Sequence, residues 1–265
     1  MKILSFNICI KIDNADKVAE YLKNTNADII CLQEVMRPLE DSVISMYRAE
    51  EVIRKYLKND YPYYFFAPEW VSDIHFGPDN VPDRIFGGMA EQGKMILSKY
   101  PIFHGYNYYY IKDYEFDRDR GSFAGGVDHG RALQVCEIDL DGKLIQIGNV
   151  HGTYTKEKVD TDKTILQSKF ILEKLSKKDL PTILVGDFNL LSTTESMKMI
   201  SGRYHDLMSD YNIKTTRPQK EGRSGPQDAV IDYVFMDNNF KAQSLNVEVN
   251  DISDHYPVIV DFELS

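Results

Sequence analysis

The fold of this chain is decided by the stretch TILVGDFNL, residues 182–190. Its first residues are apolar and mostly β-branched, which predicts a buried strand, and the run stops at Gly186, where the backbone can turn sharply. Asp187 and Asn189 follow one residue apart, so their side chains point to the same side if the backbone stays extended. A carboxylate and an amide at this place indicate either an ordinary strand-ending turn or a site that binds a hard cation, a phosphate or both.

Length and composition fit one large domain. The chain has 265 residues, of which 43% are hydrophobic and 27% charged, so it can build a sizeable core, and we expect a single domain over residues 1–265. Its formal net charge is −10, which opposes tight nonspecific binding to long nucleic acid. A nucleic-acid substrate stays open, because acidic residues can be metal ligands and a bound divalent cation inverts the local field.

The cysteines and the lengths of the apolar stretches indicate the cellular compartment of the protein. Cys9, Cys31 and Cys136 lie in or beside strand-like runs, and an odd number without a close pair matches neither a disulfide framework nor a zinc motif. We therefore expect buried, reduced thiols. No stretch of the sequence is long and apolar enough to span a membrane, and because a strand begins at Lys2 we expect no secretory leader and a cytoplasmic protein.

The hydrophobic pattern predicts many strands and few helices. We expect strands at 2–8, 28–33, 61–67, 93–98, 103–111, 131–140, 143–150, 182–187, 229–236, 240–249 and 256–262. Helices are expected from Asp13 or Asn14 to residue 25, at 40–58, at 160–177, and from Thr193 or Thr194 to residue 200, and long loops at 68–92, 113–129 and 214–227. Strands of this kind pack as sheets that share a core, with the helices on their outer faces.

Polar side chains recur at or near the ends of these strands. They are Asn7, Glu34, His151, Asp187, Asn189, Asp232 and the pair Asp254-His255. Sheets that share a core bring their strand ends together at a rim, so these residues can converge in space. Carboxylates suit a hard divalent cation, amides donate to phosphate oxygens and histidines carry protons. Any one of them alone is more often an ordinary strand-end side chain, but together they predict a catalytic site.

Short segments in order along the chain resemble the endonuclease/exonuclease/phosphatase superfamily, which has a pancreatic deoxyribonuclease-like fold. They are SFN (5–7), LQE (32–34), MILSKYPI (95–102), NVH (149–151), GDFN (186–189), IDYV (231–234) and SDHYPV (253–258). Each segment is a weak signal, but their shared order over nearly the whole chain is a strong one. The resemblance implies an α+β fold, a four-layer α/β/β/α sandwich of two facing mixed β-sheets flanked by helices. It also implies hydrolysis of a phosphate ester by in-line attack of water, assisted by Mg²⁺ or Mn²⁺.

The resemblance further implies a metal side of the site. Glu34 would be the principal metal ligand, and Asn7 would help to arrange the metal or the phosphate. Asp254 would bind metal or pair with His255.

The same resemblance implies a catalytic side. Asp187 would orient the attacking water, and Asn189 would hold a phosphate oxygen. Asp232 would support His151 or the phosphate. His255 would be the base or stabilise the pentavalent transition state, and His151 would contact the phosphate or assist the leaving group. The resemblance leaves the identity of the general base open.

The predicted loops are expected to select the substrate. The best basic cluster lies in the loop at 214–227 and consists of Lys214, Arg217, Lys220 and Arg223. We expect Arg217 and Arg223 to bind substrate together with Asn189 and His151, the alternative being a plain solvated loop.

The leading functional hypothesis is a Mg²⁺- or Mn²⁺-dependent phosphoesterase that favours a phosphodiester and acts as a monomer without a protein partner. Its substrate would be a small molecule, a lipid head group or a nucleic acid, because a shared fold and core site do not determine the substrate. The alternatives are a nuclease with the same chemistry and a catalytically silent binding protein on the same fold.

Overall fold

A computed structural model describes residues 1–9, 15–76, 82–115, 130–218 and 228–265 and contains two six-stranded sheets. The strand order of the first, sheet A, is β11-β12-β1-β2-β4-β3. Its strands are β1 (Lys2–Asn7), β2 (Ile29–Pro38), β3 (Tyr63–Phe76), β4 (Pro82–Ser98), β11 (Phe240–Val247) and β12 (Val258–Leu264). Only β1 and β2 are parallel among these pairs, so the sheet is mixed.

The second sheet, sheet B, is built in the same way. Its order is β5-β6-β7-β8-β10-β9, and its one parallel pair is β7 and β8. Its strands are β5 (Ile102–Tyr109), β6 (Ala132–Leu140), β7 (Lys143–His151), β8 (Thr182–Asp187), β9 (His205–Asp206) and β10 (Asp232–Met236). The hairpin predicted across Asp141-Gly142 is present, and both turn residues have the positive φ that a tight hairpin turn requires.

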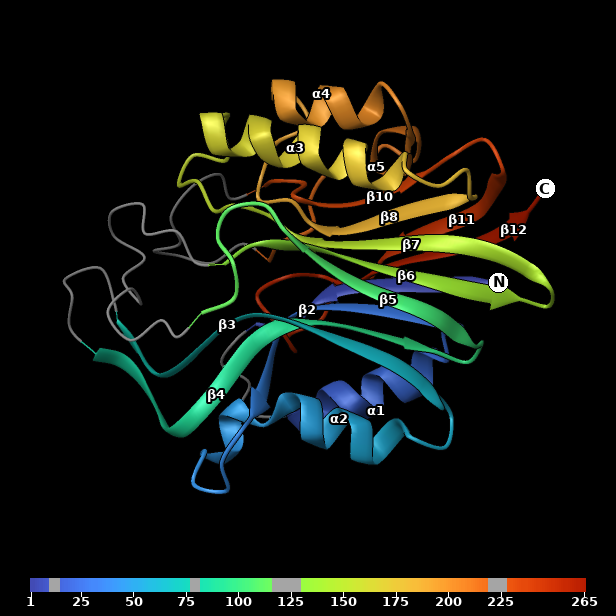
Figure 1. Ribbon diagram of the computed structural model, residues 1–265. Coiled ribbons are helices and arrows are strands. Elements are labelled where there is room, and N and C mark those ends of the chain that lie inside the picture. Colours follow the sequence, from blue (N-terminus) through green and yellow to red (C-terminus); the bar gives the residue numbers. More distant parts are fainter. Residues whose placement is uncertain (10–14, 77–81, 116–129, 219–227) are drawn as a thin grey trace.

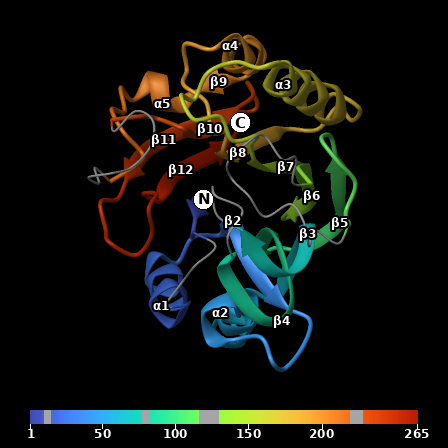
Figure 2. The same ribbon diagram turned by 90° about the vertical axis from the view of Figure 1, so that its left-hand side faces the viewer.

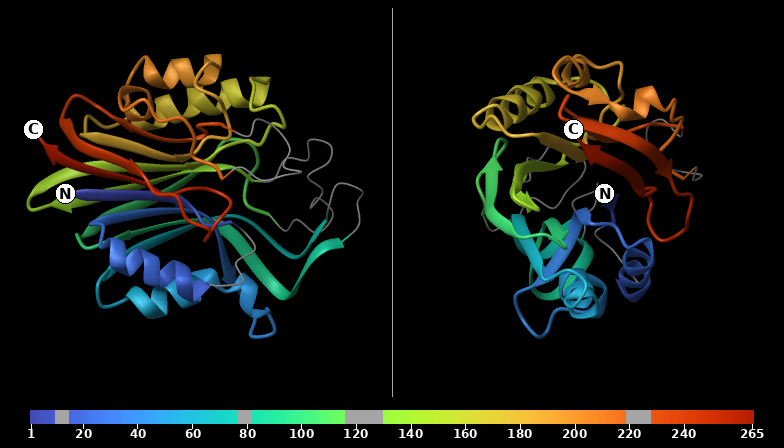
Figure 3. Two further views of the ribbon diagram at one scale, coloured as in Figure 1. Left: turned by 180° about the vertical axis from the view of Figure 1, so that it is seen from behind. Right: turned by 90° about the vertical axis from the view of Figure 1, so that its right-hand side faces the viewer.

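Helices cover the outer face of each sheet. They are α1 (Ala15–Thr25), the 3₁₀ turn η1 (Ser45–Tyr47), α2 (Ala49–Leu57), α3 (Asp162–Leu175), α4 (Glu195–Ser201) and α5 (Leu207–Asp210). Figure 1 shows α1 and α2 against sheet A and α3 and α4 against sheet B, and Figure 2 shows the same layers end-on. The predicted α/β/β/α sandwich of facing mixed sheets is thus confirmed. Because β1 and β12 are neighbours, the two ends of the chain lie close together (Figure 3).

The alternating strand pattern builds two cores. Ile3 and Ile29 face sheet B and pack in the core between the sheets. Their neighbours Leu4 and Ile30 point the other way and pack against α1 and α2. Successive side chains of a strand face opposite sides, so β1 and the first part of β2 are buried on both faces, and β1 places its carboxyl end, Asn7, deep in the molecule. No helix in the described ranges is long and apolar enough to cross a membrane.

A predicted loop and a predicted helix are wrong. The segment 68–92 is not a loop, because most of it forms the antiparallel pair of β3 and β4, whose ladder runs past Pro68 with a register shift. Its many Pro, Gly and Asp residues indicate a loop, yet Trp70 and Phe86 are buried and stack on each other. The single helix predicted at 40–58 is shorter and is divided into η1 and α2. Most of the loops predicted at 113–129 and 214–227 lies outside the described residues.

Candidate active site

The central strands of sheet B bring three of the predicted site residues into one row. His151 ends β7, Asp187 ends β8 and Asp232 begins β10, and the strand register pairs Asp187 with both of the others. From the facing sheet A, the side-chain amide of Asn7 at the end of β1 donates to Oδ2 of Asp187 over 3.0 Å. The two sheets therefore meet at Asp187, which is only 1% exposed.

Asp187 is held by donors from its own turn and from across the site. Its Oδ1 accepts a hydrogen bond from the backbone N–H of Asn189 at 2.8 Å. Its Oδ2 accepts a second one from the side-chain amide of Asn189 at 3.3 Å. Nε2 of His255 lies 3.7 Å from Oδ2. The sharp turn predicted at Gly186 falls instead at Asn189, where φ is 56°. Gly186 has a φ of 136°, and a Cβ there would lie 2.0 Å from the backbone oxygen of Val150, so only glycine lets β8 run this close to β7.

Glu34 reaches the site from a bulge in β2. The strand does not end just before Glu34, as its sequence predicts, but continues to residue 38 with one register shift. Glu34 lies at that shift with a φ of 56°, and a bulge of this kind turns a side chain out of the regular ladder. Oε1 of Glu34 accepts the amide of Asn7 at 3.1 Å and lies 3.5 Å from Nε2 of His151.

His255 is held by Asp232 rather than by its sequence neighbour. Its Nδ1 lies 3.0 Å and 2.9 Å from the two carboxylate oxygens of Asp232. Asp232 also accepts the hydroxyl of Thr216 at 2.6 Å, a residue that the sequence pattern does not single out. Asp254, the partner that the resemblance offers, is half-buried beside His255 and acts on it through its charge.

These charges determine two protonation states. Burial is the strongest influence on His255 and lowers its pKa, but Asp232 and Asp187 outweigh burial and raise the pKa to about 10. Burial would raise the pKa of Asp187, but His255 and the other nearby cationic groups outweigh it and lower the pKa. Burial raises the pKa of Asp232, and His255 offsets this only in part. At neutral pH we therefore assign His255 as imidazolium and Asp187 as carboxylate.

A buried charged trio that the sequence analysis misses supports His151. It consists of Glu69, Lys94 and Arg131, which we call the Glu69 trio. Nζ of Lys94 donates to Oε1 of Glu69 at 2.6 Å, and Nη1 of Arg131 donates to Oε2 at 3.2 Å. Arg131 also directs Nη1 at Nδ1 of His151 over 3.3 Å. Oε2 of Glu69 lies 3.5 Å from the same nitrogen, and the other ring nitrogen, Nε2, faces Glu34.

The sequence carried one signal for the Glu69 trio. Lys94 interrupts an apolar strand, and a fully buried ammonium requires a nearby counter-charge. Its partner Glu69 was hidden in a segment interpreted as a loop. Burial lowers the pKa of Lys94. Burial would raise the pKa of Glu69, but Lys94 and Arg131 outweigh it and lower that pKa.

Lys158 is a further site residue without a sequence signal. Its ammonium donates to Oδ1 of Asn189 at 2.5 Å, and the residue is 1% exposed. Its backbone has a φ of 57°, a conformation that non-glycine residues seldom adopt. Burial lowers the pKa of Lys158 to about 8, with Asp187 opposing the shift and Arg217 adding to it.

The predicted basic cluster is only partly described. Arg217 is buried, with 7% of its surface exposed, so it is not part of a solvated loop. Lys214 is exposed and donates to Asn212 at 2.5 Å. Lys220 and Arg223, the second of which is expected to bind substrate, lie outside the described residues.

The side chains around Asp187 fit a divalent cation. Ligand atoms of Glu34, His151 and Asp187 lie within 4.8 Å of one another, as do those of Asp187, Asp232 and His255. The first group is the better fit, because in the second group Asp232 and the protonated His255 already form an ion pair. Its two carboxylates are ligands of the kind that Mg²⁺ and Mn²⁺ prefer.

Asn7 supports this group as an orienting residue. Its side-chain nitrogen donates to both Glu34 and Asp187. Its Oδ1 accepts the backbone N–H of Cys9 at 3.0 Å. This arrangement holds the two carboxylates next to each other, where one cation could contact both.

Two facing mixed sheets gather carboxylates, amides and histidines at one rim, an arrangement suited to binding a cation and a phosphate. The chain belongs to the Endonuclease/Exonuclease/phosphatase family, whose model matches residues 4–255. Members of this family typically hydrolyse phosphate esters.

Solved structures share the fold at low sequence identity. An endonuclease/exonuclease/phosphatase from Beutenbergia cavernae is 18% identical with a TM-score of 0.75, over 100% of this chain and 71% of that one. The mannosyl-6-phosphatase Bt3783 of Bacteroides thetaiotaomicron is 17% identical with a TM-score of 0.63, over 100% of both chains. The human Nocturnin catalytic domain, solved with a bound sulfate anion, is 16% identical with a TM-score of 0.67, over 100% of this chain and 93% of that one. No curated protein sequence matches the chain significantly.

Proposed function

We propose that the protein is a divalent-metal-dependent phosphoesterase that hydrolyses a phosphate ester by in-line attack of water. The observation that carries the proposal is the placement of Asp187 between His151 and Asp232 in sheet B and against Asn7 of sheet A. A carboxylate this deeply buried stays ionised only because donors and cations surround it, which suits a group that orients water and takes its proton. Family membership supports the same chemistry.

The chain's own residues can take the proton of the attacking water and stabilise the phosphoryl and leaving oxygens. Asp187 would hold the attacking water and accept its proton as the water oxygen bonds to phosphorus. Asn189 and the imidazolium of His255 would donate hydrogen bonds to the phosphoryl oxygens, where negative charge accumulates. His151 would donate a hydrogen bond to the ester oxygen as its bond to phosphorus breaks, and the released alcohol would take its proton from solvent. Asp187 and His255 act here in the protonation states that the surrounding charges favour.

Glu34 would be the principal ligand of the metal. Asn7 orients its carboxylate, and the side chain of Glu34 is 23% exposed, so one face is open toward an incoming group. Asp254 is the second carboxylate that the resemblance offers. When bound, a divalent cation would neutralise phosphate charge and polarise the reacting phosphorus–oxygen bonds.

We propose a class of substrates, phosphate esters, rather than one particular compound. A phosphodiester is the ester that the sequence favours, in a small molecule, a lipid head group or a nucleic acid. A net charge of −10 weighs against a nuclease that holds long nucleic acid. The sugar-phosphate monoesterase named among the structural neighbours supports a monoester as the alternative. The three unbridged cysteines support a reducing compartment such as the cytoplasm.

Hydrolysis of reporter esters tests the proposal. The purified protein is assayed on p-nitrophenyl phosphate and bis-p-nitrophenyl phosphate with Mg²⁺, with Mn²⁺ and with a chelator. We expect metal-dependent release of nitrophenol that Asp187→Asn abolishes and that Asp210→Asn, an exposed control at the end of α5, leaves unchanged. Absence of turnover with either metal on both reporters and on a panel of inositol phosphates, sphingomyelin and abasic DNA would favour the silent binding protein.

A further inference from the structure

Two buried cations beside Asp187 lack a carboxylate partner. Lys158 is 1% exposed, and its ammonium contacts the neutral Oδ1 of Asn189 at 2.5 Å and lies over the ring of Tyr154 at 4.1 Å. Arg217 is 7% exposed. Its Nε and Nη1 are buried and have no hydrogen-bond partner in the described part of the chain. No ion pair within the described residues involves either cation.

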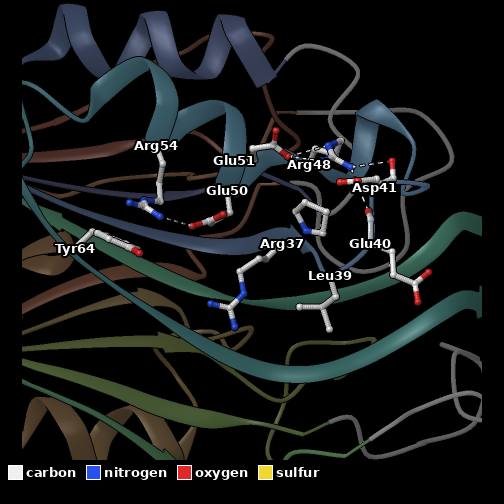
Figure 4. Close-up of a pocket in the computed structure, with 10 residues that line it drawn as sticks. Arg37, Leu39, Glu40, Asp41, Arg48, Glu50, Glu51, Arg54 and Tyr64 are labelled. Carbon is white, nitrogen blue, oxygen red and sulfur yellow. Dashed lines mark hydrogen bonds and ion pairs between the residues drawn. The ribbon is translucent and has the colours of Figure 1, made fainter.

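Several other arginines in the described part of the chain are paired with a carboxylate. In the surface pocket drawn in Figure 4, Arg48 lies 2.5 Å from Glu51 and Arg54 lies 3.6 Å from Glu50. Even the fully buried Lys94 has Glu69 at 2.6 Å. Neither Lys158 nor Arg217 has a carboxylate at ion-pair distance, although Asp187 lies near enough to act on the charge of Lys158. Buried charges that are not fully paired are unfavourable for folding, so two of them together indicate a place where a ligand brings further negative charge.

The two cations lie next to the reacting groups. Arg217 directly follows Thr216, whose hydroxyl is bonded to Asp232 at 2.6 Å. The charge of Arg217 acts on Lys158, which contacts Asn189, the residue that bonds Asp187 through its own backbone N–H. Lys158 thus contacts one residue of the candidate active site, and Arg217 directly follows a residue that holds another.

We propose that Lys158 and Arg217 bind the second negative charge of a terminal phosphoryl group, so that the enzyme prefers dianionic phosphate monoesters to simple phosphodiesters. This inference rests on the proposed phosphoesterase function and revises its expected ester type. A simple diester carries one negative charge and two non-bridging oxygens. A cation held by Glu34 and the imidazolium of His255 would contact these oxygens. A monoester carries two charges and a third terminal oxygen, and this oxygen is the one that an additional ammonium and guanidinium would hold.

Binding of inorganic phosphate tests the subsite without turnover. Thermal unfolding is followed with chelator present, in phosphate and in chloride at equal ionic strength. We expect phosphate to raise the melting temperature of the wild type and of Arg203→Gln, an exposed control arginine, and to raise that of Arg217→Gln much less. Wild-type insensitivity to phosphate, or an equal response of Arg217→Gln, would overturn the proposal.

The ratio of ester activities tests the preference itself. We expect Arg217→Gln to lower kcat/KM for p-nitrophenyl phosphate by roughly ten- to hundredfold, the range for a lost hydrogen bond to a charged group, and to change kcat/KM for bis-p-nitrophenyl phosphate less than about threefold. An equal loss on both esters would refute the assignment. If neither ester is turned over with any metal, the phosphoesterase proposal fails, whereas the phosphate-binding result still decides whether Lys158 and Arg217 form an anion subsite.

A stability measurement separates this role from a structural one. In chloride, Arg217→Gln should be at least as stable as the wild type, because it removes a buried charge that has no partner. A lower melting temperature would show that the guanidinium holds the fold, and would contradict the proposal. We expect Lys158→Gln to lose phosphate binding and to change the ratio of kcat/KM on the two esters in the same way. It replaces Arg217→Gln in these experiments if Arg217→Gln does not fold.

Discussion

Replacing Glu69 by glutamine removes the carboxylate that neutralises two buried cations. Its Oε1 lies 2.6 Å from Nζ of Lys94 and its Oε2 lies 3.2 Å from Nη1 of Arg131, and Lys94 has no exposed surface. Glutamine keeps the shape but leaves both charges uncompensated. Removing one partner of a buried ion pair costs about 3–5 kcal/mol. At about 2–4 °C per kcal/mol for a chain of this size, the melting temperature should fall by about 6–20 °C.

Thermal unfolding at pH 7 measures this loss. We expect the double variant Glu69→Gln/Lys94→Met to be more stable than Glu69→Gln alone, because it removes one of the two uncompensated charges. The matched control is Glu263→Gln, whose partner Lys241 is exposed and whose loss should cost less than about 1 kcal/mol.

The pH dependence of the same variant provides an independent check. The folded-state pKa of Glu69 lies below its ordinary value, so its stabilisation is present above a pH of about 4.3 and is lost as the pH falls toward the folded-state pKa. The stability difference between wild type and Glu69→Gln should therefore shrink in acid. A decrease in melting temperature below about 2 °C at pH 7, or a double variant whose losses simply add, would refute the counter-charge role of Glu69.

Three further predictions concern the site itself. Glu34→Gln should weaken Mn²⁺ binding by more than about tenfold in calorimetric titration with the fold intact, and an unchanged affinity would remove Glu34 from the metal side. Asp187→Asn should lower kcat by about 10²–10⁴-fold, the usual contribution of a general base, and a wild-type rate would refute that role. The folded-state pKa of His255 is raised from 6.5 to about 10, so its pairing with Asp232 stabilises the wild type fully below pH 6.5 and is lost as the pH rises through 10. Urea unfolding at pH 7 and at pH 10.5 should give a lower free energy of unfolding at the higher pH for the wild type, and this decrease should be absent in His255→Asn. The same pH dependence in both proteins would contradict the stabilising role of the pair.

The sequence was sufficient for most of the architecture. Apolar runs of strand length, the Asp141-Gly142 turn signal and the order of short motifs led to two facing sheets with outer helices, and the structure has them. The segment 68–92 was misread because its Pro and Gly content indicates a loop, whereas pairing with a neighbouring strand and the burial of Trp70 and Phe86 make most of it sheet. Local composition cannot report a long-range pairing of this kind.

The candidate site was predictable where residue type and strand end coincide, and not elsewhere. Asp187, Asp232 and His151 could be named because polar residues that end buried strands are conspicuous. The contact between His255 and Asp232 joins residues 23 positions apart and required coordinates. Lys158 follows no pattern in the sequence, because its burial depends on how the segment after β7 folds over Asn189. Residues that act by supporting others are set by packing, which the sequence pattern does not encode.

The central claim is tested most directly by diffraction from a crystal soaked with Mn²⁺ and phosphate, measured at the manganese absorption edge. We expect an anomalous peak on the carboxylate of Glu34 and a phosphate within hydrogen-bond distance of Asn189 and His255, with its remaining oxygen toward Lys158 and Arg217. A manganese peak away from Glu34 and Asp187, or phosphate bound outside the rim where the two sheets meet, would contradict it.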